Sequence, residues 1–199
     1  MIERKEAENP SRKKSFWREA EEVMKVFLVS LAIVLPIRYF IVQPFIVRGA
    51  SMEPNFENRE YLIIDEASYY LREPKRGEVV VFRYPLDRRQ YFIKRIIGLP
   101  GERVEIQNGR VHIINAQYPD GFVLEEPYLV PPDRFTRPDM ISTLGDNEYF
   151  VMGDNRDFSS DSRLWGPLGK HLIVGRTLLR VWPFADFGFV SDINHSIRR

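Results

Sequence analysis

Cysteine is absent from the 199 residues, and its absence rules out disulfides, thiolate nucleophiles and cysteine-ligated metals. Histidine is scarce as well. The chain contains only His112, His171 and His195, and none of them stands in an HxxxH or HExxH arrangement. We therefore expect neither a zinc site nor a Ser-His-Asp triad, and we expect no cofactor.

An excess of charge of one sign is also lacking, since the formal net charge is only +1. Nucleic-acid binding calls for a strongly basic face, so we expect no nucleic-acid partner. No glycine-rich phosphate loop is present. The stretch Gly49-Ala50-Ser51-Met52-Glu53 lacks the last glycine of the GxSxG elbow found in α/β hydrolases. The length suits one sizeable core, or a core with a small insertion.

Long uncharged runs are missing too, with one partial exception. Val26–Ile37 is apolar for twelve residues, whereas a helix that spans a bilayer needs about 20. The apolar character resumes directly after Arg38, and an arginine near a helix end can reach the lipid headgroups. We therefore predict a retained transmembrane anchor over residues 26–43, preceded by a charged cytoplasmic tail at residues 1–25.

The alternatives for this run are a buried core helix and a cleaved signal peptide. A signal peptide is disfavoured because a charged stretch of about 25 residues precedes the run and no small-residue cleavage site follows it. Lysines and arginines before the run predict a cytoplasmic N-terminus, which would place everything after about Gln43 outside the cytoplasm.

The chain beyond Pro44 is built from short runs rich in β-branched residues, separated by turns. Asn108-Gly109 between two such runs is a strong signal for a type I′ hairpin. We predict a proline-rich loop over residues 117–141. The fold class predicted is mainly β, with a barrel-like or folded antiparallel sheet. The predicted strands are Tyr61–Asp65, Glu78–Phe82, Tyr91–Ile97, Val104–Gln107, Arg110–Ile114, Tyr149–Met152 and Leu172–Trp182.

A serine nucleophile without histidine needs another base, and lysine is the residue type available. Lysine accepts a proton only when it is neutral, so its pKa must fall through desolvation. Alternation along a strand places Lys94 on one face with Phe92 and Ile96, which is an apolar surface. Lys94 is therefore the best candidate, although a lysine on an edge strand that reaches solvent would give the same pattern.

Four segments, in order, resemble the sequence boxes of bacterial type I signal peptidases. The fourth is the longest match and runs from Met152-Gly153-Asp154-Asn155-Arg156-Asp157 through Ser159, Asp161, Ser162, Arg163, Trp165 and Gly166. The first three are Val47-Arg48-Gly49-Ala50-Ser51-Met52-Glu53-Pro54, Arg76-Gly77-Glu78-Val79-Val80-Val81-Phe82 and Tyr91-Phe92-Ile93-Lys94-Arg95-Ile96-Ile97-Gly98-Leu99-Pro100-Gly101.

This resemblance implies a role for each of five residues. Ser51 would be the nucleophile and Lys94 the general base of a Ser-Lys dyad. Ser159 would orient the lysine amine, and Asp161 and Arg163 would support the site as an acid–base pair. Judged on chemistry alone, an Asp-x-Arg in a loop is usually a surface pair that contributes little.

The oxyanion hole is the point at which the sequence departs from some members of the family. Those members carry a serine two residues before the nucleophile, where this chain has Gly49. The resemblance extends to members with glycine there. It implies that the Ser51 backbone N–H is the main donor, and we expect a backbone N–H or a water near Gly49 to be the second.

The resemblance also implies a substrate class and a place in the cell. Signal peptides end in small residues in an A-x-A pattern, and an extended peptide would pair with strand edges near Phe45 to Ala50 and Phe92 to Lys94. Expected partners are preproteins emerging from the translocation machinery and membrane lipid, at a bacterial cell membrane or a thylakoid membrane. The expected substrate-binding residues are Phe45, Val47, Gly49, Ala50, Met52, Phe92 and Ile93.

The implied domain organisation has a catalytic core at residues 44–102 and 148–190 with an inserted cap region at 103–147. A polar tail follows at 191–199. The aromatic stretch Trp182–Val190 fits either core packing or contact with the membrane interface. Two other functions stay open: a self-cleaving Ser-Lys peptidase of the repressor type, and a membrane-tethered β module without catalysis.

Overall fold

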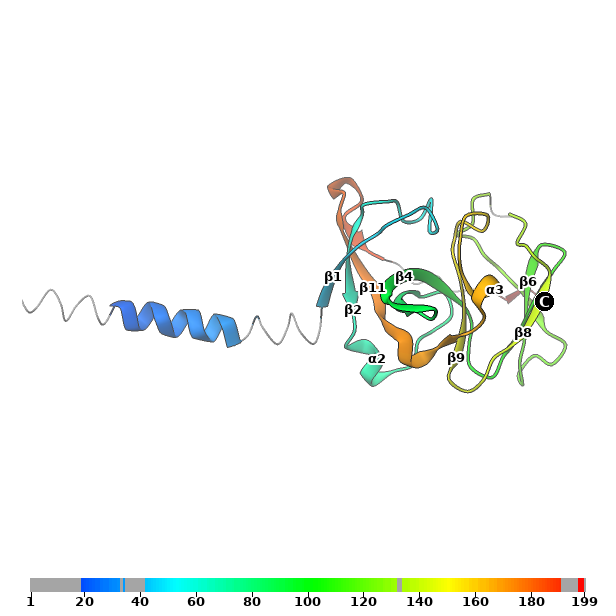
Figure 1. Cartoon of the computed structure of the whole chain (residues 1–199), viewed down its shortest axis with the longest axis horizontal. Helices are drawn as coiled ribbons and strands as arrows, with labels where there is room; N and C mark the ends of the chain where they lie inside the picture. Colours follow the sequence, from blue (N-terminus) through cyan, green and yellow to red (C-terminus); the bar gives the residue numbers. More distant parts are fainter. Residues whose placement is uncertain (1–18, 33, 35–41, 132–133, 191–196, 199) are drawn as a thin grey trace, which may run out of the picture. The chain divides into compact units, whose positions relative to one another are not determined.

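The structure is a computed structural model that describes residues 19–32, 34, 42–131, 134–190 and 197–198 (Figure 1). It divides into two compact units, residues 1–41 and 42–199. In the first unit, residues 19–32 form a helix on which Val23 and Phe27 are largely exposed.

The predicted membrane anchor is only partly covered by this helix. Positions 33 and 35–41 of the anchor lie outside the described residues, as do residues 1–18 of the predicted tail and positions 191–196 and 199 of the C-terminal tail. Among the residues that are described, none of the helices combines the length and the apolar character needed to cross a bilayer.

The second unit contains a large sheet in which all paired strands are antiparallel, so the prediction of a mainly β antiparallel fold is confirmed. The order across the sheet is β1 (Val42–Ile46), β2 (Tyr61–Asp65), β11 (Ile173–Trp182), β3 (Val79–Tyr84), β4 (Asp87–Gly98), β9 (Glu148–Met152) and β10 (Leu168–Gly169). A further strand, β12 (Gly188–Phe189), pairs with β11 outside this order.

A second sheet comes mainly from the region expected to be an inserted cap. Its order is β13 (Ile197–Arg198), β7 (Phe122–Leu124), β6 (Arg110–Ile114), β5 (Arg103–Gln107) and β8 (Met140–Thr143). In Figure 1, β6 and β8 lie on the side of this unit away from β1 and β2. The short helices are α2 (Ser68–Leu71) and α3 (Ser162–Trp165), with 3₁₀ turns η1 (Lys170–Leu172) and η2 (Phe184–Asp186).

The hairpin predicted at Asn108-Gly109 is confirmed. Both residues have positive φ angles, 50° and 77°, as a type I′ turn requires, and β5 and β6 pair on either side of them. The prediction of a loop over residues 117–141 is wrong in part, because β7 lies within it and β8 begins at Met140. Three residues are too few for β7 to show a periodic pattern, and its strand conformation depends on pairing with β6.

Strand β4 is the element that contributes to all three apolar clusters of the core. It contributes a buried isoleucine to each of three apolar clusters, through Ile93, Ile96 and Ile97. Its first half behaves differently, since residues 88–91 are exposed. β4 pairs with β3 along most of its length, but β9 covers its other edge only from Arg95 onward. Among the described strands, none pairs with the second backbone edge of the first half of β4, and a cavity lies beside this edge.

Candidate active site

Ser51 lies in a tight turn that follows β1, and a buried apolar residue lies on each side of it in the sequence. Val47 before it and Met52 after it are each only 1% exposed and belong to the same core cluster as Phe56. Gly49 adopts a φ of +93°, a conformation that residues with a side chain rarely take. The turn is therefore fixed in the core at both ends, and Ser51 itself lines the cavity.

Lys94 reaches Ser51 from the second half of β4. Its Nζ lies 2.7 Å from Ser51 Oγ and 2.8 Å from the Ile93 carbonyl oxygen, and both contacts are hydrogen bonds. The Lys94 residue is only 3% exposed. Its Nζ lies 5.3 Å from the centre of the Phe92 ring, as the predicted shared strand face implies. The structure therefore brings together the two residues expected to form the dyad.

Burial is the main influence on the protonation of Lys94. Desolvation disfavours the ammonium form, and although the carboxylates of Asp161 and Asp154 oppose this effect, the pKa of Lys94 falls to about 8. Neither carboxylate forms an ion pair with Lys94 within the described part of the chain. A lysine with this pKa is neutral in about a tenth of molecules at pH 7, far more than at its usual pKa, and a general base must be neutral to accept a proton.

Asp161 and Arg163 form a buried bidentate pair, although the Asp-x-Arg pattern alone suggested a surface one. Arg163 Nε and Nη2 each donate to an Asp161 oxygen at 2.8 Å, and the two side chains are 5% and 0% exposed. Asp161 also accepts from the Gly153 N–H at 3.0 Å. Burial alone would raise the pKa of Asp161, but these bonds outweigh it and hold that pKa below its usual value.

Ser159 is half-buried beside this pair, with its Oγ atom fully buried. Its hydroxyl contributes to lowering the pKa of Asp161, but it makes no well-aligned hydrogen bond within the residues that the structure describes. Its Oγ also lies against Gly153, where an added Cβ would come within 2.3 Å of it. The structure thus places Ser159 next to Asp161 and Gly153, and orientation of the lysine amine by Ser159 stays a prediction.

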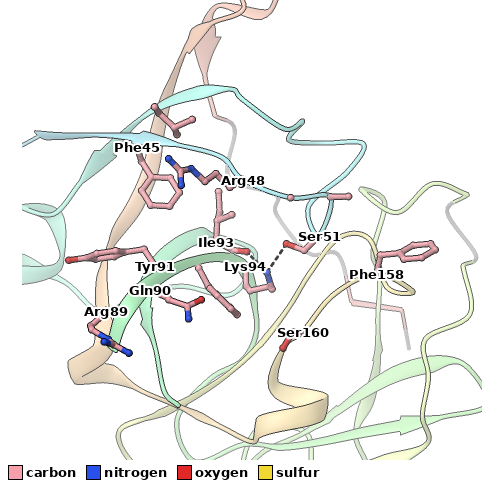
Figure 2. A pocket seen from close by; sticks show the side chains of 14 residues that line it. Phe45, Arg48, Ser51, Arg89, Gln90, Tyr91, Ile93, Lys94, Phe158 and Ser160 are labelled. Atoms are coloured by element: carbon pink, nitrogen blue, oxygen red, sulfur yellow. Dashed lines mark hydrogen bonds between the residues drawn. The ribbon is translucent and has the colours of Figure 1, made fainter. Parts of the chain in front are cut away.

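A cavity of about 630 Å³ opens over the dyad. In Figure 2, Phe45 and Tyr91 lie at one end and Phe158 at the other, with Ser51 and Lys94 between them. Five of the residues expected to bind substrate line this cavity, whereas Val47 and Met52 lie in the core below the turn. The five lining residues are Phe45, Gly49, Ala50, Phe92 and Ile93.

Sequence reasoning gave no role to several residues around the cavity. Arg48, Arg89 and Phe158 line it. They are exposed residues of loops or of a strand edge, so no periodic pattern in the sequence marks them. Arg95 and Asp154 form a second buried pair, with Arg95 Nε 2.9 Å and Nη2 2.6 Å from the Asp154 oxygens. Opposite charges in two of the matched segments were the one signal that could have suggested this pair.

Comparisons with known proteins identify the family of the chain. Residues 20–182 match the protein family described as "Signal peptidase, peptidase S26". The "Probable signal peptidase I-1" of Synechocystis sp. is 35% identical over 179 residues, which covers 86% of this chain and 87% of the relative. "Signal peptidase I S" of Bacillus subtilis is 35% identical over 190 residues, with 90% and 96% covered. A crystal structure of a signal peptidase I from Enterococcus faecalis is 30% identical, with a TM-score of 0.46, and covers 53% of this chain and 97% of that one.

Proposed function

Because the chain belongs to the signal peptidase family of peptidase S26, and is therefore a serine endopeptidase that removes signal peptides, we propose that Ser51 is its nucleophile and Lys94 its general base. The observation that carries this proposal is the hydrogen bond of 2.7 Å between Ser51 Oγ and Lys94 Nζ. The lowered pKa of Lys94, about 8, makes the neutral amine available to accept the serine proton.

The reaction follows from these two side chains. Ser51 Oγ attacks the scissile carbonyl carbon while its proton passes to Lys94 Nζ. The tetrahedral intermediate collapses as the C–N bond breaks, and the lysine ammonium gives the proton to the leaving amine. Lys94 then takes a proton from water, which attacks the ester carbonyl carbon. As the C–O bond to Ser51 breaks, the lysine ammonium returns this proton to Ser51 Oγ, and the acid product leaves.

We further propose that the substrate binds as an extended strand along the unpaired edge of β4. Ile96 exchanges backbone hydrogen bonds with the β3 side, through Gly77 N and Glu78 O at 2.8 and 2.9 Å. Backbone groups alternate between the two edges of a strand, so those of Tyr91 and Ile93 point toward the cavity. β1, with no neighbour beyond β2 among the described strands, supplies a second edge near Phe45.

Small substrate residues of the A-x-A type suit this arrangement. Gly49 and Ala50 line the cavity with little or no side chain, so a peptide backbone can approach Ser51 closely. A preprotein whose residues before the cut are small would therefore bring its scissile carbonyl to Ser51 Oγ.

The membrane anchor over residues 26–43 is also part of the proposal. It rests on the apolar sequence and on the charged residues that precede it. It would hold the catalytic unit on the extracytoplasmic side of a bacterial or thylakoid membrane, where preproteins emerge from the translocation machinery. The region 103–147 would act as a cap without chemistry of its own.

Cleavage of a preprotein by the detergent-solubilised full chain tests the dyad. Ser51→Ala and Lys94→Ala are each expected to lose at least about 10³-fold in rate, because each removes a group that takes part in every turnover. Two matched controls should cleave like the parent: Ser142→Ala, at a half-buried serine of β8, and Lys170→Ala, at a half-exposed lysine paired with Glu73. Cleavage by either dyad variant at more than a tenth of the parent rate would refute the assignment.

A further inference from the structure

Asn155 makes two hydrogen bonds to consecutive residues of the nucleophile turn, although it lies more than a hundred positions away in the sequence. Its side-chain Nδ2 donates to the Ala50 carbonyl oxygen at 3.0 Å, and its backbone N–H donates to the Ser51 carbonyl oxygen at 3.0 Å. Asn155 is only 9% exposed. Asn155 therefore holds the carbonyl groups on either side of the Ser51 Cα atom, and the Glu53 N–H adds a longer hydrogen bond of 3.2 Å to the Ala50 oxygen.

The orientation of the Asn155 amide follows from its surroundings. The Ala50 oxygen is an acceptor, so the Asn155 atom that faces it must be the donor, Nδ2. The other amide atom, Oδ1, is buried and has no hydrogen-bond partner within the described residues. Reversing the amide would set two oxygens against each other, so the contact to Ala50 is the one that satisfies the donor.

Fixing the Ala50 carbonyl also fixes the direction of the Ser51 N–H. The two groups belong to one planar trans peptide and point in opposite directions. Ala50 and Ser51 both line the cavity, whereas Asn155 lies behind them and does not. With the carbonyl held toward Asn155, the Ser51 N–H points away from it, toward the cavity where the scissile carbonyl would lie.

The neighbouring backbone donor is already occupied. The Gly49 N–H donates to Asn58 Oδ1 at 3.2 Å. The Ser51 N–H, by contrast, has no acceptor in the part of the chain that the structure describes. Of these two N–H groups, the one at Ser51 is therefore free to donate a hydrogen bond to the substrate oxygen on which negative charge develops.

We propose that Asn155 is a positioning residue that aims the Ser51 N–H into the oxyanion hole by holding the Ala50 carbonyl oxygen. The proposal rests on the proposed role of Ser51 as nucleophile. When Ser51 Oγ adds to the substrate carbonyl, the carbonyl π electrons move to its oxygen, and the Ser51 N–H donates a hydrogen bond to that oxyanion. Asn155 touches neither substrate nor oxyanion and acts only through the peptide plane between Ala50 and Ser51.

Asn155→Leu tests this proposal, since leucine is similar in size to asparagine and has no amide. We expect kcat to fall about 10- to 100-fold with little change in KM, because an oxyanion donor acts mainly in the transition state. The midpoint of the pH–rate profile should stay where it is in the parent, because Lys94 keeps its surroundings. Asn115→Leu removes a half-buried amide that follows β6 and donates to Glu102, which precedes β5, and it should leave kcat and KM unchanged.

Two inhibitors give a readout that loss of stability would not reproduce. A peptide aldehyde with an A-x-A end adds to Ser51 Oγ and forms a tetrahedral oxyanion, whereas the matching peptide alcohol binds without that charge. Asn155→Leu should weaken the aldehyde by the same factor as kcat and leave the affinity of the alcohol within about twofold. Asn155→Ala gives the same comparison if the leucine variant does not fold.

Either of two results would overturn the proposal: parent-like kcat and aldehyde affinity in the folded variants, or an equal weakening of aldehyde and alcohol. Both differ from a failure of the proposed function, which would appear instead as cleavage by Ser51→Ala. An Asn155 variant with normal activity, beside an inactive Ser51→Ala, would leave the dyad in place and remove only the positioning role.

Discussion

The two sheets of the second unit bury different kinds of residue. In β5, β6 and β7 every buried side chain is apolar, and the buried positions alternate with less buried ones. At the cavity end of the large sheet, by contrast, charged and amide side chains are buried together. The apolar set is Val104, Ile106, Val111, Ile113, Phe122 and Leu124, and the polar set is Lys94, Arg95, Asp154, Asn155 and Asp161.

This difference shows where the fold tolerates the desolvation of charge. A buried charge is costly unless it is paired, and Arg95 with Asp154 and Asp161 with Arg163 are each paired through two hydrogen bonds. Lys94 has no such carboxylate partner among the described residues, so its desolvation appears as a lowered pKa. The desolvation of Lys94 thus costs stability, and it lowers the pKa as the proposed role of general base requires.

Breaking the buried pair of the large sheet should have the largest effect on stability. Asp154→Ala leaves Arg95, only 2% exposed, without its carboxylate and should lower the free energy of unfolding by about 3–5 kcal/mol. Glu105→Ala removes the partner of Arg103 on the second sheet, where Arg103 is half exposed, and should change it by less than about 1 kcal/mol. Urea unfolding of both variants measures the contrast, and equal losses would contradict it.

Gly153→Ala should have the next largest effect, and this effect is on activity. A Cβ at this position would lie 2.3 Å from the Ser51 carbonyl oxygen, so the nucleophile turn must move. Displacement of a reacting group by about 1 Å costs on the order of 100-fold in rate, and we expect kcat/KM to fall by about that factor.

Gly188→Ala is the matched control for that change, because an added Cβ there meets nothing within 4 Å. It should leave kcat/KM at the parent value. Parent-like activity of Gly153→Ala would mean that the turn tolerates displacement, contrary to our expectation of a fixed nucleophile.

Lys94→Met should change stability in the opposite direction and make the folded protein more stable. The unfolded chain holds the lysine proton up to about pH 10.5, whereas the folded protein releases it near pH 8, so parent stability rises with pH between these values. Below pH 8 the deficit is constant at about 3 kcal/mol, and methionine should recover up to about that amount. Urea unfolding at pH 7 and at pH 10.5 checks this, and a stability gain that did not shrink at the higher pH would contradict it.

The contrast between the sheets also explains what the sequence could predict. Alternation and the Asn108-Gly109 turn were enough for β5 and β6, because local patterns determine a hairpin with one apolar face. β2 was predicted with its observed bounds for the same reason. β7 was missed because its three residues form a strand only through pairing with β6.

The site was less accessible to such patterns. Strand alternation placed Lys94 and Arg95 on opposite faces, and the apolar neighbours of Lys94 predicted burial for that residue alone. Both are buried, because β4 is covered on both faces in its second half. The contacts of Asn155 with Ala50 and Ser51 join positions 105 and 104 apart, separations at which chain spacing carries no information. Only the resemblance between ordered segments brought the nucleophile, the lysine and the Gly153–Asn155 segment together.

The dependence of cleavage rate on pH tests the central claim, that neutral Lys94 is the base for Ser51, most directly. Protonation of Lys94 removes the base, so kcat/KM for a preprotein should be constant above about pH 9 and fall about tenfold per pH unit below a midpoint near pH 8. A rate unchanged between about pH 6 and pH 9, or a single midpoint near 6.5 as for an imidazole, would contradict the assignment.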